Sequence, residues 1–331
     1  MLGPNTELLT RKENKMSNKD TSKAAKLKKF LRKHRGYQGL LFILPALILL
    51  CIFCLYPTIM AFVNSFTNWD GGTKADFIWF DNYKNVFSDK LFWTSLLNAV
   101  ILTVVGMILG NAASIFLAEL MYNLKSKMMP AYRFLFVLPA MIPGIIVLLL
   151  WQKLIFSGSS SGLANTILSW FGGEPLEWFA SKDVWVVFIS IFLYGFPWVG
   201  GTSFLIYLAG LNGIDRSLME ASEIDGLSFW GRVFKIDLPL ISGQLKYFLV
   251  MGFIGGLQNY SIQYAITNGG PGEVIDSMQS GTMVPGYYIY RLITGSSKEG
   301  AYGYACAMGV VMFIIIMIVT VINNKLIKSK E

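Results

Sequence analysis

The segment EASEIDGLSFWGRVFKIDLP, residues 220–239, places three acids within six residues, ahead of a glycine and a basic amphipathic run that contains a final proline. Apolar stretches of about 20 residues lie on both sides of it. A polar, patterned segment between two such stretches is typical of a loop that joins two membrane-spanning helices. The number of apolar stretches in the whole chain therefore decides the fold.

Six apolar segments are long enough to cross a hydrocarbon core of about 30 Å as helices. The 331 residues are 54% hydrophobic and only 15% charged, whereas soluble domains carry roughly 25% charged residues. Six such segments would leave a soluble protein too little polar surface, so we predict an all-α polytopic membrane protein with six transmembrane helices. The predicted spans are residues 39–62, 93–117, 134–156, 184–208, 245–266 and 302–322.

Basic residues predict the orientation of the spans. Residues 1–36 hold eleven Lys and Arg against three acids, which accounts for the net charge of +8. Nucleic-acid binding is one interpretation of a basic arm, but a cytoplasmic tail ahead of a first span is the simpler one. With alternating spans, the cytoplasmic side carries 21 Lys and Arg and the outer side seven. We therefore expect both termini and the loop at residues 212–240 to be cytoplasmic, and no nucleic-acid partner.

The chain is expected to divide into three regions. They are a basic, compositionally disordered tail at residues 1–36, a six-helix permeation domain at residues 37–325, and a short cytoplasmic tail at residues 326–331.

The inner loop, residues 212–240, has the pattern of two short helices joined by a turn. Asp and Ser favour helix N-caps, Gly favours the left-handed residue that ends a helix, and Pro interrupts one. In this loop the caps are Asp215 and Ser228, the turn residue is Gly226, the helices are 216–224 and 229–236, and the stop is Pro239. We expect a compact charged element that either docks on a protein or lies on lipid headgroups.

Polar and small residues inside two of the spans indicate a solute path. Polar groups within a membrane are costly and usually face a cavity. In the span 245–266 glycines and amides recur at three- and four-residue steps and share one face, while the span 184–208 offers aromatic residues and Pro197, which should kink it. Tight helix packing by small residues is the alternative interpretation. The candidate path residues are Tyr194, Gly195, Trp198, Gly255, Gln258, Asn259, Tyr260 and Gln263.

Two blocks of sequence resemble a known family. Glu220-Ala221-Ser222-x-x-Asp225-Gly226, followed by Pro239, is similar to the EAA loop of binding-protein-dependent ABC transporter permeases. Thr267-Asn268-Gly269-Gly270-Pro271-Gly272, followed by Tyr302-Gly303-Tyr304, resembles the carbohydrate branch of that family, the maltose and glycerol-phosphate type. The resemblance covers about residues 37–325.

The resemblance implies a role for the inner loop and a set of partners. Glu220, Ala221, Ser222, Asp225, Gly226 and Pro239 would couple to a cytoplasmic ATPase dimer. The other partners would be a second permease subunit, commonly a different chain, an extracytoplasmic solute-binding protein, a sugar and the lipid bilayer of the bacterial cytoplasmic (inner) membrane. No G-x-x-x-x-G-K-[ST] motif occurs, so Mg-ATP would bind the ATPase and this chain would hold no cofactor.

The resemblance also concerns the path. In maltose-type members the bound sugar touches the segments that correspond to the fourth and fifth spans, which implies contacts at Gly195, Trp198, Gly255 and Asn259. Gly255 stands where the maltose member has a bulkier side chain, so the sugar pose would differ here.

An ion-coupled secondary transporter, with the inner loop as a gate, is the competing interpretation. That class usually shows ionisable groups well inside its spans. The one candidate here, Glu119, sits at the inner end of its span, which argues against this class. A membrane enzyme is disfavoured because the chain has one His and three Cys, all three in apolar segments, and no nucleophile or metal constellation. We therefore expect no catalytic residue and no metal site.

Overall fold

The computed structural model of the protein describes residues 35–73, 75–124, 127–275, 277–295 and 300–326. They fall into two compact units, Met1–Met60 and Ala61–Glu331. Apart from Arg35 and Gly36, the predicted basic tail lies outside the described residues, and apart from Leu326 so does the predicted C-terminal tail.

The first predicted span is one helical stretch. α2 (Arg35–Leu50) passes through a π-helical turn, η1 (Cys51–Leu55), into α3 (Tyr56–Asn64). The side chains of residues 42–60 are all exposed. An apolar helix of this kind requires an apolar surrounding, which a bilayer supplies. Phe42–Asn64 is long and apolar enough to cross a membrane, as predicted for residues 39–62.

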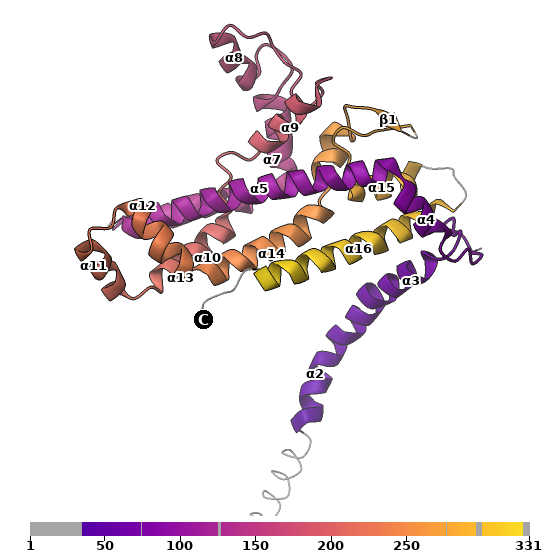
Figure 1. Ribbon diagram of the computed structural model, residues 1–331, viewed down its shortest axis with the longest axis horizontal. Coiled ribbons are helices and arrows are strands. Elements are labelled where there is room, and N and C mark those ends of the chain that lie inside the picture. Colours follow the sequence, from indigo (N-terminus) through magenta and orange to yellow (C-terminus); the bar gives the residue numbers. More distant parts are fainter. Residues whose placement is uncertain (1–34, 74, 125–126, 276, 296–299, 327–331) are drawn as a thin grey trace, which may run out of the picture. The chain divides into compact units, whose positions relative to one another are not determined.

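The larger unit is organised around α5 (Lys90–Asn123), a helix of 34 residues and about 50 Å. α5 packs against α10 (Gly201–Asn212) and α14 (Ser242–Gln258), and α14 packs in turn against α16 (Ala301–Leu326) (Figure 1). Both α5 and α16 are long and apolar enough to cross a membrane, which confirms the helical prediction for residues 93–117 and 302–322.

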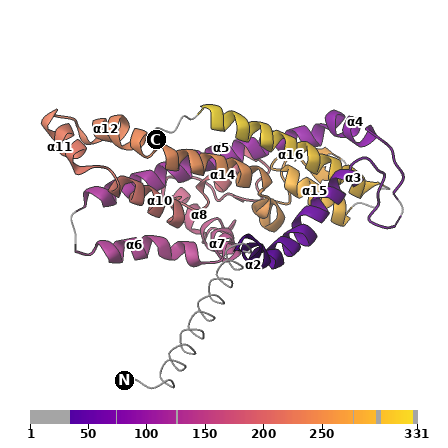
Figure 2. The same ribbon diagram turned by 90° about the horizontal axis from the view of Figure 1, so that it is seen from below.

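Two hydrophobic clusters hold the two halves of α5. Near its start, Leu91, Phe92 and Ala99 pack with residues of α15 (Pro285–Gly295) and α16. Near its end, Ala118 and Met121 pack with the α10 residues Phe204, Tyr207, Leu208 and Leu211. Figure 2 shows the helices of the inner loop at one end of α5, and α4 (Asp81–Ser88) and α15 toward the other.

The third predicted span is bent, not straight. α6 (Met129–Val137) and η2 (Leu138–Met141) meet α7 (Gly144–Leu150) and η3 (Trp151–Ile155) at 86°. A proline disfavours helical backbone in the residue before it, and Ile142, which precedes Pro143, has an extended ψ of 130°. Pro143 therefore accounts for the break.

The prediction of one helix over residues 184–208 is wrong. α9 (Val184–Leu193) and α10 are separated by an irregular segment, residues 194–200. Gly195 and Trp198 have φ values of 81° and 59° there, which an α-helix excludes, and Pro197 has no N–H to donate. The ten residues of α9 reach only about 15 Å.

The fifth predicted span is also interrupted. α14 ends at Gln258, Asn259 has an extended ψ of 129°, and helix resumes before η5 (Gln263–Thr267). Ahead of it, Phe229–Leu240 meets Ser242–Thr267 at 72°. Among the described residues, three helices are long and apolar enough to cross a membrane, or five if each bent pair is one span, where six were predicted.

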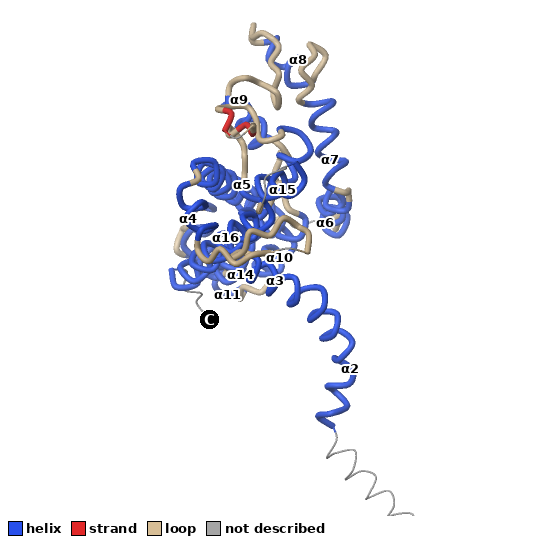
Figure 3. The backbone as a smooth tube through the Cα atoms, turned by 90° about the vertical axis from the view of Figure 1, so that its right-hand side faces the viewer, coloured by secondary structure: helices blue, strands red, loops and turns tan. Residues whose placement is uncertain are grey.

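The rest of the larger unit is short elements, and the fold is mostly helical, where we expected helices alone (Figure 3). α8 (Leu163–Trp170) lies in the connection between η3 and α9. β1 (Val274–Ile275) and β2 (Met278–Gln279) form an antiparallel pair with Val274 opposite Gln279. This hairpin belongs to the segment 267–284, which joins η5 to α15.

Asn98 fastens that segment to α5. Its Nδ2 lies 3.0 Å from the Ser280 carbonyl oxygen, 3.1 Å from that of Gly281 and 3.0 Å from that of Met283, and the residue is buried. One amide therefore contacts three carbonyl oxygens of this segment.

We expect Asn98→Leu to loosen residues 267–284 by about 1–3 kcal/mol, the cost of leaving buried polar groups unsatisfied. Hydrogen exchange followed by mass spectrometry on the purified protein would show faster exchange in this segment and unchanged exchange along α10. The exposed Asn85→Leu on α4 is the matched control. Equal exchange in the two variants would contradict the assignment.

Candidate functional site

The first half of the inner loop is built by local capping rules. α11 (Arg216–Ile224) begins at Asp215, whose Oδ1 accepts a hydrogen bond from the Ser217 backbone N–H at 2.9 Å. Hydrogen bonds from the Ser217 backbone and hydroxyl lower the pKa of Asp215, so the cap stays ionised. The turn after α11 contains Gly226 with a φ of 69°, the left-handed conformation that favours glycine. The predicted cap at Asp215 and the predicted left-handed turn at Gly226 are confirmed.

The second half begins as predicted but does not stop where predicted. Ser228 caps α12 (Phe229–Arg232), with its Oγ accepting from the Gly231 N–H at 3.2 Å. The helix then continues as η4 (Val233–Asp237) and α13 (Leu238–Leu240). Pro239 directly follows the π-helical turn, in which the Leu238 N–H donates to the Val233 carbonyl oxygen, and this wider turn accommodates a residue that has no N–H to donate. The expectation that Pro239 ends the helix at residue 236 is wrong.

The predicted coupling residues divide into an exposed group and an inward-facing pair. The exposed ones are Glu220, Ala221, Asp225 and Gly226. Ser222 is buried and donates its hydroxyl to the Met219 carbonyl oxygen at 2.7 Å, and Pro239 is half-buried. Ile224, beside the acids, is 87% exposed. Single exposed apolar side chains are common on protein surfaces, so a docking role depends on the whole loop and not on Ile224 alone.

A cavity of about 360 Å³ lies where the two interrupted helices face α5. Five of the eight predicted path residues line it together, from two spans: Tyr194, Gly195, Trp198, Asn259 and Gln263. α5 contributes residues that include Thr103, Gly106 and Gly110. We call this the central cavity.

Side chains at the central cavity also stabilise its irregular backbone. The Trp198 Nε1–H donates to the Phe192 carbonyl oxygen at 2.7 Å, and the Asn259 Oδ1 accepts from the Ser261 N–H at 3.0 Å. Broken helices at membrane depth need such partners, because no water is available to satisfy the freed backbone groups.

The glycines of α14 separate the path interpretation from the packing one. A Cβ on Gly256 would lie 2.5 Å from Thr103 Cγ2, and one on Gly252 would lie 2.9 Å from Met107 Cγ, so both are packing glycines against α5. A Cβ on Gly255 would meet nothing within 4 Å. Gly255, Gln258 and Tyr260 do not line the central cavity, and the Tyr260 ring instead stacks on Tyr290 with centroids 6.1 Å apart.

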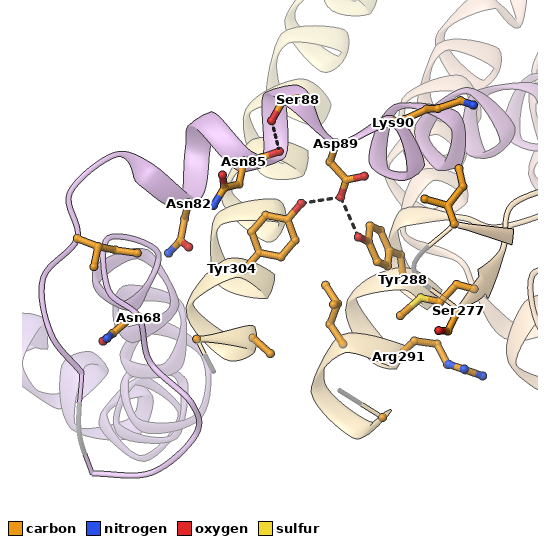
Figure 4. A pocket seen from close by; sticks show the side chains of 17 residues that line it. Asn68, Asn82, Asn85, Ser88, Asp89, Lys90, Ser277, Tyr288, Arg291 and Tyr304 are labelled. Atoms are coloured by element: carbon orange, nitrogen blue, oxygen red, sulfur yellow. Dashed lines mark hydrogen bonds between the residues drawn. The ribbon is translucent and has the colours of Figure 1, made fainter. Parts of the chain in front are cut away.

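A second cavity, of about 780 Å³, lies around Asp89 at the start of α5 (Figure 4). Asp89 caps α5 with one carboxylate oxygen, and its Oδ2 accepts hydrogen bonds from the Tyr288 hydroxyl at 2.8 Å and the Tyr304 hydroxyl at 2.5 Å. Other polar lining residues are Asn68, Asn82, Asn85, Ser88, Lys90, Ser277 and Arg291. Sequence reasoning missed this Asp89 cavity, because no local pattern links Asp89 to the two tyrosines.

Comparison with known proteins gives a family match and several relatives. Residues 110–330 match the family described as "binding-protein-dependent transport system inner membrane component". The sulfoquinovosyl glycerol transport system permease protein SmoG of Agrobacterium fabrum is 32% identical over 298 residues, which cover 88% of this chain and 91% of SmoG. The lactose transport system permease protein LacF of Rhizobium radiobacter is 28% identical over 295 residues, covering 88% and 94% of the two chains.

Among solved structures, the fold is similar to a chain of a bacterial ABC transporter involved in the import of the acidic polysaccharide alginate. The TM-score is 0.72 at 22% sequence identity, and the match covers 91% of this chain and 98% of the other. At this identity the likeness concerns the fold.

The turn at Gly226 yields a direct test of the loop geometry. We expect Gly226→Ala to destabilise residues 215–232 by about 1 kcal/mol, because an L side chain disfavours a φ of 69° even though the space is open. Gly226→Asn should largely restore the loop, since Asn tolerates this conformation. Hydrogen exchange of the loop amides in the purified protein measures both.

The matched control is Gly243→Ala in the first turn of α14, where a Cβ also meets nothing within 4 Å but no positive φ is required. It should leave exchange unchanged or slower, because Ala favours helix over Gly. A Gly226→Ala variant as protected as the Gly243→Ala control would contradict the assigned strain.

Proposed function

The chain belongs to the family of binding-protein-dependent transport system inner membrane components, and we propose that it is one of two permease subunits of an ATP-driven importer for a sugar, in particular an oligosaccharide. It is a multi-pass, non-catalytic protein of the bacterial cytoplasmic membrane. The observation that carries the proposal is the exposed, capped helix–turn–helix of the inner loop, which joins α10 to α14. α14 lines the central cavity at Gly256, and the irregular segment ahead of α10 lines it at Tyr194, Gly195 and Trp198.

In this proposal the chain crosses the membrane six times and both termini are cytoplasmic. The fourth crossing is α9 and α10 together, and their irregular connection is tolerated because it lines a cavity. The permeation domain covers residues 37–325, with short cytoplasmic segments at 1–36 and 326–331. The excess of basic residues on the cytoplasmic side supports this orientation.

The inner loop would dock on a cytoplasmic ATPase dimer. Glu220, Ala221, Asp225 and Gly226 supply the exposed surface, while Ser222 and Pro239 position it from within. Mg-ATP would be bound and hydrolysed by the ATPase, whose closure would displace the loop. The exposed acids favour a basic surface on that partner.

The chemistry of the central cavity supports an uncharged, hydroxyl-rich solute. None of the described residues that line it is Asp, Glu, Lys, Arg or His. The amides of Asn259 and Gln263 can donate to and accept from hydroxyl groups, and Trp198 offers an apolar ring face for a sugar. The names of SmoG, LacF and the multiple sugar-binding transport system permease protein MsmF of Streptococcus mutans, 29% identical over 313 residues, support the same substrate class.

A cavity of this size on one chain would form one wall of the path. A second permease subunit, in this proposal a different chain, would supply the other wall, and an extracytoplasmic binding protein would deliver the sugar. One of the similar solved structures is described as an alginate ABC transporter in complex with an alginate pentasaccharide-bound periplasmic protein. The match to binding-protein-dependent permeases supports this interpretation over that of an ion-coupled secondary transporter.

Charge reversal at the docking surface tests the coupling. We expect Glu220→Lys to lower sugar uptake by about tenfold or more while the protein still reaches the membrane. The new lysine would repel the basic surface expected on the ATPase. Glu220 pairs with Arg216 at 3.5 Å, but both side chains are largely exposed, so loss of this pair changes stability little.

The control is Arg216→Glu combined with Glu220→Lys, which keeps the pair on α11 and should still fail. Radiolabelled sugar uptake in cells, normalised to membrane content by immunoblot, measures all variants. Wild-type uptake in Glu220→Lys and in Gly226→Leu would remove the docking role.

Two substitutions at Asn259 separate the path from local structure. Asn259→Leu removes both the amide and the cap on the Ser261 N–H, whereas Asn259→Ser keeps a capping oxygen but loses the amide. We expect both to lower transport in proteoliposomes by about tenfold, the effect of losing a polar contact to substrate, with the complex still assembled. Trp198→Ala should act in the same direction. Normal transport in Asn259→Ser alongside failure of Asn259→Leu would assign the residue to structure instead.

A further inference from the structure

Four polar side chains meet where the inner loop contacts the end of α5; three of them are buried, and Asn123 is exposed. Arg232 of α12 and Asp237 of η4 come from the loop, and Glu119 and Asn123 come from α5. The Arg232 Nε donates to Asp237 Oδ2 at 2.9 Å, and its Nη2 donates to Asn123 Oδ1 at 2.7 Å and lies 3.7 Å from Glu119 Oε2. Arg232, Asp237 and Glu119 are 9%, 0% and 1% exposed. We call this set the Arg232 cluster.

Stability alone does not explain the Arg232 cluster. A buried ion pair is commonly no more stabilising than apolar side chains of the same volume, because desolvation offsets the attraction. Here two acids face one guanidinium, and neither oxygen of Glu119 nor the Oδ1 of Asp237 has a hydrogen-bond partner among the described residues. The arrangement instead supplies a specific attachment. Arg232 bonds Asp237 within the loop and Asn123 on α5, and the guanidinium fixes the geometry of both bonds.

A second contact joins the same two elements. The ring of Trp230 on α12 stacks on Phe116 of α5, with centroids 6.2 Å apart and planes 10° from parallel. Phe116 precedes Glu119 by three residues, so the stack and the Arg232 cluster lie on adjacent parts of one helix surface. Two different contacts therefore restrain sliding of α12 along α5.

α5 extends from this attachment to both cavities. Its middle, from Ala99 to Gly110, contributes residues to the central cavity. Its first residues are capped by Asp89, which the tyrosines of α15 and α16 bind. A single unbroken helix thus reaches from the inner loop to the Asp89 cavity (Figure 1).

We propose that Arg232 is a positioning residue that fastens the inner loop to α5, so that the loop and α5 move as one body and a displacement of the loop reaches the central cavity and the Asp89 cavity through α5. This inference rests on the proposed function, in which a docked ATPase displaces the loop. It assigns the transmission of the loop's movement to α5, although the loop is covalently joined to α10 before it and α14 after it.

The first test removes the attachment without leaving a buried charge. The triple variant Arg232→Met, Glu119→Gln, Asp237→Asn is reconstituted with the ATPase, the second permease and the binding protein. We expect assembly and ATP hydrolysis to persist, with the sugar transported per ATP hydrolysed reduced by about fivefold or more, which a purely structural role would not change. Lys235→Met, which neutralises an exposed cation within η4, is the control and should keep the wild-type ratio. A wild-type ratio in the triple variant would overturn the proposal.

The second test does not depend on the folding of that variant. In a background with Cys51, Cys54 and Cys306 replaced by serine, Phe116→Cys and Trp230→Cys are bridged by a short bifunctional thiol reagent in the assembled complex. If α12 and α5 move as one body, the bridged complex transports at the rate of the unbridged one. Loss of transport on bridging, with ATPase subunits still bound, would show that the two must separate and would overturn the proposal. If instead the proposed function is wrong, purification of the wild-type chain would recover no ATPase, which distinguishes that outcome from failure of the present inference.

Discussion

The hydrocarbon core of a bilayer contains no water, so backbone N–H and C=O groups there must find partners within the protein. α5 meets this constraint with 34 residues of continuous helix. The neighbouring helices meet it less completely, because α9 and α10 are separated and α14 stops at Gln258. Both interruptions face the central cavity, where Trp198 and Asn259 bond freed backbone groups. The cavity therefore exists where two broken helices lie against an intact one.

Polar contacts hold α5 at both of its ends. Asp89 at its start binds two tyrosines, and Glu119 and Asn123 near its end meet Arg232. Between them the helix packs through glycines of α14 that approach Thr103 and Met107 closely. This distribution suits a rigid element that is fixed at both ends and lines a path between them.

Sequence reasoning succeeded where the governing physics is local. Capping by Asp215 and Ser228 and the left-handed turn at Gly226 depend on side chains within a few residues, so their pattern was sufficient. The extent of the break at residues 194–200 was not predicted, because a positive φ is rare for a bulky residue such as Trp198 and no local pattern indicated one. Pro239 was misjudged because a π-helical turn ahead of it changed which N–H groups needed a partner.

Contacts between distant residues were beyond prediction. Arg232 and Asn123 are 109 positions apart, and Asp89 is 199 positions from Tyr288. No periodicity or motif reports such pairs from a single chain. Five of the eight path residues were nevertheless brought to one cavity, because the amide and aromatic positions reflect the cost of polar groups in a membrane.

The most direct test of the account is affinity purification of this chain from gently solubilised membranes of its own host, followed by mass spectrometry. A Glu220→Cys variant is cross-linked to its neighbours before the membranes are solubilised. The account predicts recovery of a P-loop ATPase joined to the inner loop, together with a second multi-pass permease. Recovery of the chain alone or as a homodimer, with no ATPase even after cross-linking, would contradict it.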